Sequence, residues 1–247
     1  MNPIIIAFYL TPKKLCRYII SSIPRLYLMY SCLFSLQFRV TKKTQLICDS
    51  YPRSGNSYLE AAIKYFSTRE INISHHAHAP AVIIYAIKKR IPCVLLIREP
   101  KDAIASYFLL NQKIPLLFCA LDYLFYYLPL IPHRKSLVIL KTSEIDKYLP
   151  SILLSFSNIY NLPFKSSPIS EQVKKNISMD VDSNGILRSG RVEAYSATHT
   201  KSYQLQRSQS IQKIKDRLSL FPYSVLMRIN DYAYGLVSSC SFSKKAK

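Results

Sequence analysis

The chain has 247 residues, of which 34 are lysine or arginine and 14 are aspartate or glutamate, giving a formal net charge of +20. This length fits one compact domain or two small ones and excludes a long multidomain assembly. Because 49% of the residues are hydrophobic, the chain is not a disordered basic tail. We therefore expect a folded, strongly cationic protein with an anionic partner, which composition alone does not identify.

Residues 1–43 combine apolar and basic residues, and we predict that they form a segment separate from an α/β domain over residues 44–247. The basic residues follow the first apolar run, which is the reverse of the order in a signal peptide. A transmembrane helix over residues 18–38 would enclose Pro24 and Arg25. We expect this segment to pack on the domain or to contact an anionic membrane surface, in preference to spanning a membrane.

Short apolar runs alternate with helical patterns after residue 44. Strands are predicted at residues 45–50, 93–97 and 136–140. Helices are predicted at residues 56–67, 80–89, 100–110, 116–128, 143–160, 211–220 and 223–234. Pro150 is expected to break the helix over residues 143–160. Strands that alternate with helices predict an α/β fold whose central parallel sheet is flanked by helices.

The apolar run at residues 115–132 has the composition of a membrane span but is predicted to be a core helix. Pro115 and Pro129 bracket a helix that is too short for a bilayer. A true span would also place strands of one sheet on opposite sides of the membrane.

The six cysteines include no C-x-x-C pair. Cys48 and Cys93 lie inside apolar runs, which indicates free, buried thiols. Free thiols are typical of a reducing compartment, so we expect a cytoplasmic protein.

The first motif that carries chemistry runs from Cys48 to Tyr58, with the sequence CDSYPRSGNSY. A buried strand ends, the chain turns, and a helix begins, so backbone N–H groups at the helix N-terminus can bind a phosphate. Arg53 adds charge, and Asn56 and Ser57 add hydrogen-bonding side chains. The lysine of a Walker A loop is absent. An ordinary helix start explains the motif equally well when it is taken alone.

A second strand end favours the phosphate interpretation. The strand over residues 93–97 continues into REPKDAIASY, from Arg98 to Tyr107. Arg98 would lie at the carboxyl end of the strand and Ser106 on the second turn of the next helix, where both could hold one phosphate.

These two motifs resemble those of the sulfotransferases that use 3′-phosphoadenosine 5′-phosphosulfate (PAPS). YPRSGNSY, from Tyr51 to Tyr58, is similar to their 5′-phosphosulfate loop, and the segment from Arg98 to Ser106 is similar to their 3′-phosphate motif. A third piece, LRSGRV over residues 187–192, resembles their C-terminal Arg-x-Gly element. The resemblance covers roughly residues 44–235 and is dense only at the motifs.

The resemblance implies a three-layer P-loop-type domain and transfer of a sulfuryl group from PAPS to a hydroxyl or amine, without a metal. It implies that PAPS is held by Arg53, Ser54, Gly55, Asn56, Ser57, Tyr58, Arg98, Ser106, Arg188, Ser189 and Gly190, with Arg191 as a further candidate. Arg53 would also stabilise charge on the bridging oxygen as the nucleotide leaves.

A histidine between the two motifs is implied as the base that activates the acceptor. His78, two residues before Pro80, fits that position best, and His75 and His76 are rivals. Neutral imidazole can take the acceptor proton because its ordinary pKa lies near neutrality. The clustered histidines also suggest a metal site, which we disfavour because no cysteine or carboxylate is near them in the sequence.

Several positions depart from the family pattern. Arg53 stands where many members have lysine, and Tyr58 stands where tryptophan often stacks on adenine. Thr142 replaces a common aromatic residue, and Glu193-Ala194-Tyr195 replaces the usual pattern after the last glycine. These changes indicate a divergent member of the family.

The alternatives are a nucleotide-binding protein of the same fold without turnover, a P-loop kinase, and a basic adaptor for nucleic acid or membranes. The kinase lacks its loop lysine, and no nucleic-acid-binding motif is present. The acceptor pocket is expected from residues 79–85, 108–128 and 166–188, the last a polar, weakly periodic and mobile segment that closes over the ligand. Carbohydrate, lipid and small alcohol acceptors all remain open.

Overall fold

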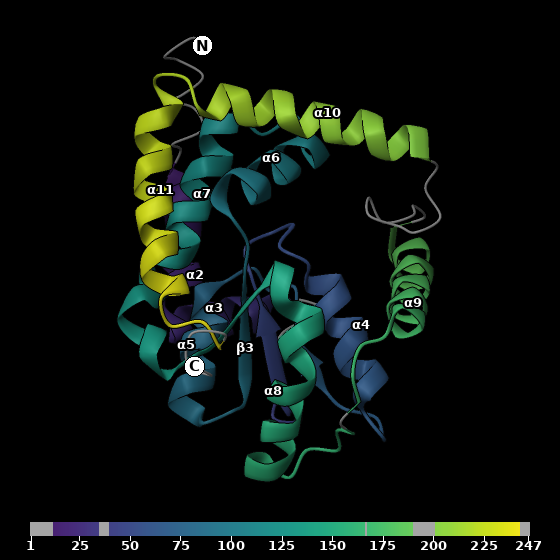
Figure 1. Ribbon diagram of the computed structural model, residues 1–247. Helices are drawn as coiled ribbons and strands as arrows, with labels where there is room; N and C mark the ends of the chain where they lie inside the picture. The colour runs from purple at the N-terminus through teal and green to yellow at the C-terminus, as the bar shows by residue number, and fades with distance from the viewer. Residues whose placement is uncertain (1–11, 35–39, 166, 190–200, 243–247) are drawn as a thin grey trace.

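The computed structural model describes residues 12–34, 40–165, 167–189 and 201–242, without the side chains of residues 12–14, 184–189 and 201. A four-stranded parallel sheet in the order β2-β1-β3-β4 has helices on both faces (Figure 1). The predicted three-layer α/β fold is therefore confirmed. The strands are β1 Leu46–Asp49, β2 Ile73–Ser74, β3 Cys93–Ile97 and β4 Val138–Lys141.

Alternate residues of the central strands face opposite layers of the core. Ile47 of β1 and Leu95 of β3 join one cluster, and Cys48 and Leu96 join the other. All of these side chains are buried, as expected where helices cover both faces of a parallel sheet. This burial explains why the two central strands have continuous apolar sequences.

The helices divide between the two faces. On one face are α4 Asn56–Phe66, α8 Ile145–Tyr160 and α9 Glu171–Ser189. The other cluster includes α3 Pro24–Leu33, α5 Pro80–Lys89, α6 Pro100–Leu110, α7 Leu116–Tyr127, α10 Lys201–Leu218 and α11 Tyr223–Ser238. Helix α2 Pro12–Ser22 and the short helices η1 Leu128–Ser136 and η2 Thr142–Glu144 complete the described elements.

The chain leaves β1 and β3 toward opposite faces of the sheet. After β1 it enters α4 and then the neighbouring edge strand β2, and after β3 it passes through α6 and α7 to β4. The two connections diverge where β1 and β3 lie side by side, with Ile47 paired to Cys93. Such a divergence opens a crevice at the carboxyl ends of the strands, where open α/β sheets bind ligands.

Three predictions about the helices are wrong. Helix α8 runs through Pro150 without a break, and buried side chains on both sides of that proline, Leu149 and Ile152, anchor it to the core. Residues 171–189 form α9 although a polar, mobile segment was predicted. The predicted helix over residues 211–220 begins ten positions earlier, at Lys201. Both α9 and α10 are rich in polar residues, so their apolar periodicity is weak.

Helices α2 and α3 pack against α5. Tyr27 is buried in the core, the Tyr18 ring stacks on Phe125, and the Tyr18 hydroxyl donates a hydrogen bond to Asp122. The described residues of the N-terminal segment thus pack on the α/β domain, while its contact with a membrane remains a prediction.

Helix α7 and η1 together form a stretch, Leu116–Ser136, that is long and apolar enough to cross a membrane by length and composition alone. Helix α7 packs against α6 and α11, and buries Phe118, Cys119 and Tyr123. The prediction of a core helix is therefore confirmed. All six cysteines are free thiols, as predicted.

Candidate nucleotide site

A cleft of about 870 Å³ lies at the carboxyl ends of β1 and β3. Its walls come from the loop after β1, the start of α4, the histidine segment before α5, the start of α6, and α9. Of the predicted site residues, those that line it are Arg53, Gly55, Asn56, Ser57, Tyr58, His78 and Arg98. Ser54 is fully buried behind the loop.

The loop after β1 has two residues in the left-handed region, Arg53 at φ 66° and Gly55 at φ 100°. A Cβ atom at Gly55 would lie 3.3 Å from the Thr142 methyl carbon and 3.4 Å from Leu96 Cδ2. The left-handed backbone therefore favours glycine here, and a Cβ would also require the Thr142 side chain to move by a few tenths of an ångström.

Side chains from two other strand ends hold this loop. Arg98 Nη1 donates a hydrogen bond to the Arg53 carbonyl oxygen at 2.9 Å. The Thr142 hydroxyl lies 2.6 Å from the Ser54 carbonyl oxygen and 3.0 Å from that of Ile97. Thr142, which departs from the family pattern, thus connects the ends of β3 and β4 to the loop.

Helix α4 begins at Asn56, so its first backbone N–H groups lie beside the loop, and Ser57 and Tyr58 line the cleft. The positive end of the helix dipole favours an anion at this place. The Tyr58 hydroxyl donates to Asp146 Oδ1 at 2.7 Å, and burial together with that carboxylate raises the Tyr58 pKa above its usual value. The phenol therefore stays protonated, and its ring is held at the cleft wall.

A buried carboxylate, Asp49, organises the neighbouring histidine segment. It accepts the backbone N–H groups of His78 at 3.0 Å and Ala79 at 3.1 Å, and the Tyr126 hydroxyl at 3.2 Å. Burial raises the pKa of Asp49 above its usual range, and the nearby His78 and the backbone donors oppose that shift. The segment is thereby fixed to the end of β1.

The ring of His78 has a defined orientation at the cleft. Its Nδ1 lies 2.7 Å from the Ser50 carbonyl oxygen. A carbonyl oxygen only accepts hydrogen bonds, so Nδ1 carries the proton in the neutral ring and Nε2 keeps the lone pair. This tautomer suits a base that acts through Nε2. The backbone of His78, at φ 47°, is left-handed.

The two rival histidines have different surroundings. His75 is buried, and its Nδ1 lies 3.1 Å from Glu60 Oε2 of α4. His76 lines the cleft, with Nε2 at 3.2 Å from Ser57 Oγ and Nδ1 at 3.8 Å from Glu60 Oε2. These contacts are with a carboxylate and a hydroxyl, whereas the Nδ1 of His78 contacts a carbonyl oxygen.

Ser106 is fully buried and does not line the cleft. Its hydroxyl instead accepts a hydrogen bond from Arg207 Nη2 of α10 at 3.2 Å. Arg207 was not predicted as a site residue, because its polar helix carries no family motif. If Ser106 binds a phosphate as predicted, Arg207 would add a further positive charge beside it.

The third motif falls at the limit of the described residues. Arg188 and Ser189 are the last two residues of α9, but the structure does not describe their side chains. Gly190 and Arg191 lie outside the described residues. Their predicted contacts with the nucleotide remain predictions.

Three cleft cations were missed by sequence reasoning. Arg17 comes from α2, Lys141 from the end of β4, and Lys174 from α9. Lys174 Nζ lies 3.2 Å from Asp146 Oδ2, the carboxylate that also binds Tyr58. The chain contains 34 lysine and arginine residues, so the sequence alone does not distinguish those that line the cleft from those on the solvated surface.

No family model matches the chain, and no curated protein matches it significantly. Among solved structures, mouse sulfotransferase SULT7A1 complexed with PAP aligns with 83% of this chain and 94% of its own, at 14% identity and a TM-score of 0.39. A similarity at this level identifies no family. The fold described above rests on the strands and helices of this chain.

Substitutions of Gly55 and Gly235 by alanine provide a matched test of the loop conformation. Gly55→Ala should destabilise the protein by about 1–3 kcal/mol because alanine is strained at this backbone conformation. Gly235→Ala in α11, where a Cβ meets nothing within 4 Å, should stabilise it by about 0.5–1 kcal/mol. Urea unfolding followed by circular dichroism measures both, and equal effects would contradict the assigned loop conformation.

Proposed function

We propose that the cleft binds PAPS and that the protein is a sulfotransferase acting on a hydroxyl or amine acceptor. The observation that carries this proposal is the convergence of Arg53, Arg98 and His78 on one cleft, from the ends of two adjacent strands and the segment before α5. The motif resemblance supplies the identity of the ligand. The SULT7A1 structure contains PAP, the desulfated product of PAPS, which is the probe we would use first.

The proposed nucleotide contacts are electrostatic. The loop N–H groups and Arg53 would hold the 5′-phosphosulfate, and Arg98 would hold the 3′-phosphate. Arginine stays protonated at neutral pH, so Arg53 would stabilise the departing phosphate as a cation and not as a proton donor. A phosphate that reaches the Ser106 hydroxyl would also meet Arg207. Tyr58 would offer its ring to adenine.

The proposed reaction uses His78 as general base. Nε2 takes the acceptor proton while the acceptor oxygen or nitrogen forms a bond to sulfur. The bond between sulfur and the bridging oxygen breaks, and its electron pair leaves with the nucleotide as PAP. The Ser50 carbonyl, 2.7 Å from Nδ1, would stabilise the imidazolium that results.

The nucleotide site is tested by calorimetric titration of PAP with magnesium chelated and salt fixed. Arg98→Ala should weaken binding by about 10- to 100-fold, since hydrogen bonds to charged groups contribute about 1.5–3 kcal/mol. Arg228→Ala is the matched control, because Arg228 is exposed on α11 and does not line the cleft. Absence of PAP binding by the unchanged protein would contradict the proposal, and ATP with magnesium would then test the kinase alternative.

Turnover is tested with ³⁵S-labelled PAPS and a panel of sugar, lipid, small alcohol and amine acceptors. His78→Asn should lower the transfer rate by about 10²- to 10⁴-fold while PAP affinity is retained. Asparagine tolerates the left-handed backbone of His78, so the loss would report the missing base. His133→Asn is the control. PAP binding without transfer to any acceptor would favour the alternative of a nucleotide-binding protein that has lost turnover.

The N-terminal helices suggest where the proposed contact with an anionic membrane would occur. Leu26, Met29 and Leu33 of α3 lie three or four residues apart, and their exposed fractions are 41%, 63% and 78%. Leu15 and Ile19 of α2 are also exposed. An exposed apolar helix face on a protein of charge +20 fits peripheral binding to anionic lipid.

Leu33→Gln should reduce partitioning onto phosphatidylserine-containing vesicles about 10- to 100-fold, because inserting one leucine contributes about 1.5–3 kcal/mol. Leu205→Gln, which removes a leucine of 60% exposure from α10, should leave it unchanged. Vesicle sedimentation measures both. Equal binding by the two variants would contradict a role for the α3 face.

A further inference from the structure

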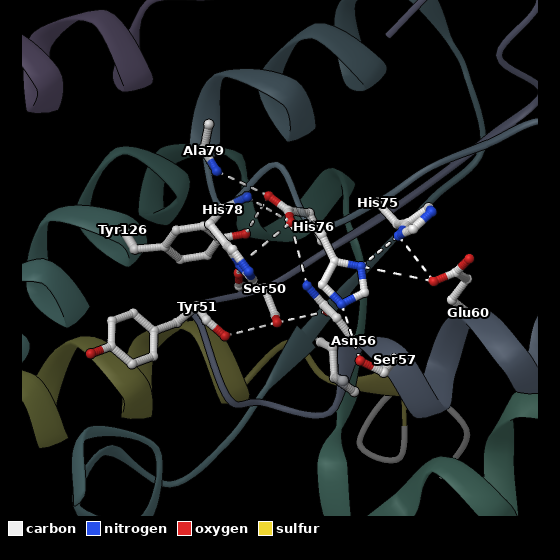
Figure 2. A network of polar contacts seen from close by, with 12 residues as sticks. Ser50, Tyr51, Asn56, Ser57, Glu60, His75, His76, His78, Ala79 and Tyr126 are labelled. Atoms are coloured by element: carbon white, nitrogen blue, oxygen red, sulfur yellow. Dashed lines mark hydrogen bonds and ion pairs between the residues drawn. The ribbon is translucent and has the colours of Figure 1, made fainter. Parts of the chain in front are cut away.

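Three potential metal ligands converge beside the cleft, at a place that the proposed sulfotransfer does not use. Glu60, His75 and His76 each offer one ligand atom, and these atoms lie within 4.8 Å of one another (Figure 2). Glu60 comes from α4, and the two histidines follow β2. Sequence reasoning disfavoured a metal because no carboxylate was near the histidines along the chain, but the fold supplies Glu60.

The atoms are those that a zinc-class cation prefers. His75 Nδ1 and His76 Nδ1 are 2.5 Å apart, and they lie 3.1 and 3.8 Å from the same carboxylate oxygen, Glu60 Oε2. Two ligands at about 2.0–2.1 Å from one tetrahedral zinc are separated by about 3.3 Å. The three separations bracket that value, and each differs from it by less than about 1 Å.

The surroundings also favour metal ligation. His76 Nε2 lies 3.2 Å from Ser57 Oγ, and an Nε2–H that donates to this hydroxyl leaves the lone pair on Nδ1. Lys64 Nζ contacts Glu60 Oε1 at 2.7 Å, so the lysine engages the other carboxylate oxygen. Both Glu60 and His75 side chains are buried, at 5% and 7% exposure, which holds their rotamers.

We propose that Glu60, His75 and His76 form a binding site for a zinc-class divalent cation. Two imidazoles and one carboxylate, with a further position left for water or another ligand, match the ligand set of known zinc sites. Because His76 lines the cleft while His75 is buried, the cation would lie in the cleft wall. It would fasten the histidine segment to α4 and so hold the neighbouring His78.

The site is tested by titrating Zn²⁺ into the metal-depleted protein in competition with a chromogenic chelator. The exposed thiols Cys16 and Cys32 are replaced by serine in all variants, since they could bind zinc themselves. We expect one equivalent per chain, and Co²⁺ substitution should give the visible absorption of a tetrahedral site.

His76→Asn and Glu60→Gln should each weaken Zn²⁺ binding by more than the 10- to 100-fold that changes around the ligands cost. Asparagine tolerates the left-handed backbone of His76, and circular dichroism checks that the buried Glu60→Gln variant folds. His133→Asn is the matched control and should bind as the parent does. Equal Zn²⁺ affinity in the parent, His76→Asn and His133→Asn would overturn the proposal.

The proposals for the metal site and the nucleotide site are tested independently of each other. The PAP titration is carried out with a chelator present, so loss of zinc binding leaves that result intact. Conversely, Zn²⁺ binding that depends on His76 would stand even if no PAP binds.

Discussion

Asp49 places a fully buried carboxylate at the carboxyl end of β1, where the loop, the histidine segment and α7 meet. Its acceptor oxygens take two backbone N–H groups and the Tyr126 hydroxyl, all from outside its own strand. A buried carboxylate without such donors would cost several kilocalories per mole. The need to satisfy it therefore fixes the backbone of His78 and Ala79, and with it the side of the cleft on which the His78 ring lies.

The opposite wall depends on a second set of contacts with carbonyl oxygens. Arg98 bonds the Arg53 carbonyl, and Thr142 reaches those of Ser54 and Ile97. Side chains from two neighbouring strand ends thus hold two carbonyl oxygens of the loop, those of Arg53 and Ser54. Arg98 serves both sides of this arrangement, since it contacts the loop and also lines the cleft. A side chain with five donors is suited to such a double role.

Short-range signals were sufficient wherever one residue fixes the local backbone. Pro80 and Pro100 stand at the first position of α5 and α6, and both helices begin and end at the predicted residues. The bounds of β3 were also predicted, because burial on both faces of the sheet makes its five residues a continuous apolar run. Helices α9 and α10 were missed or shortened because their polar sequences leave a weak period, and packing decides their extent.

The site residues that sequence reasoning missed are those brought in from distant parts of the chain. Glu60 precedes His75 by fifteen positions, and Arg207 meets Ser106 across about a hundred. Only the packing of α4 against the sheet and of α10 against α6 places these pairs together.

The left-handed backbone at His76 and His78 could not be predicted from the periodicity of the sequence. It directs the two rings to different partners, Glu60 and the Ser50 carbonyl, although only one residue separates them. One short segment can therefore present a ligand atom to a cation and a lone pair to the cleft, and the three histidines need not compete for one role.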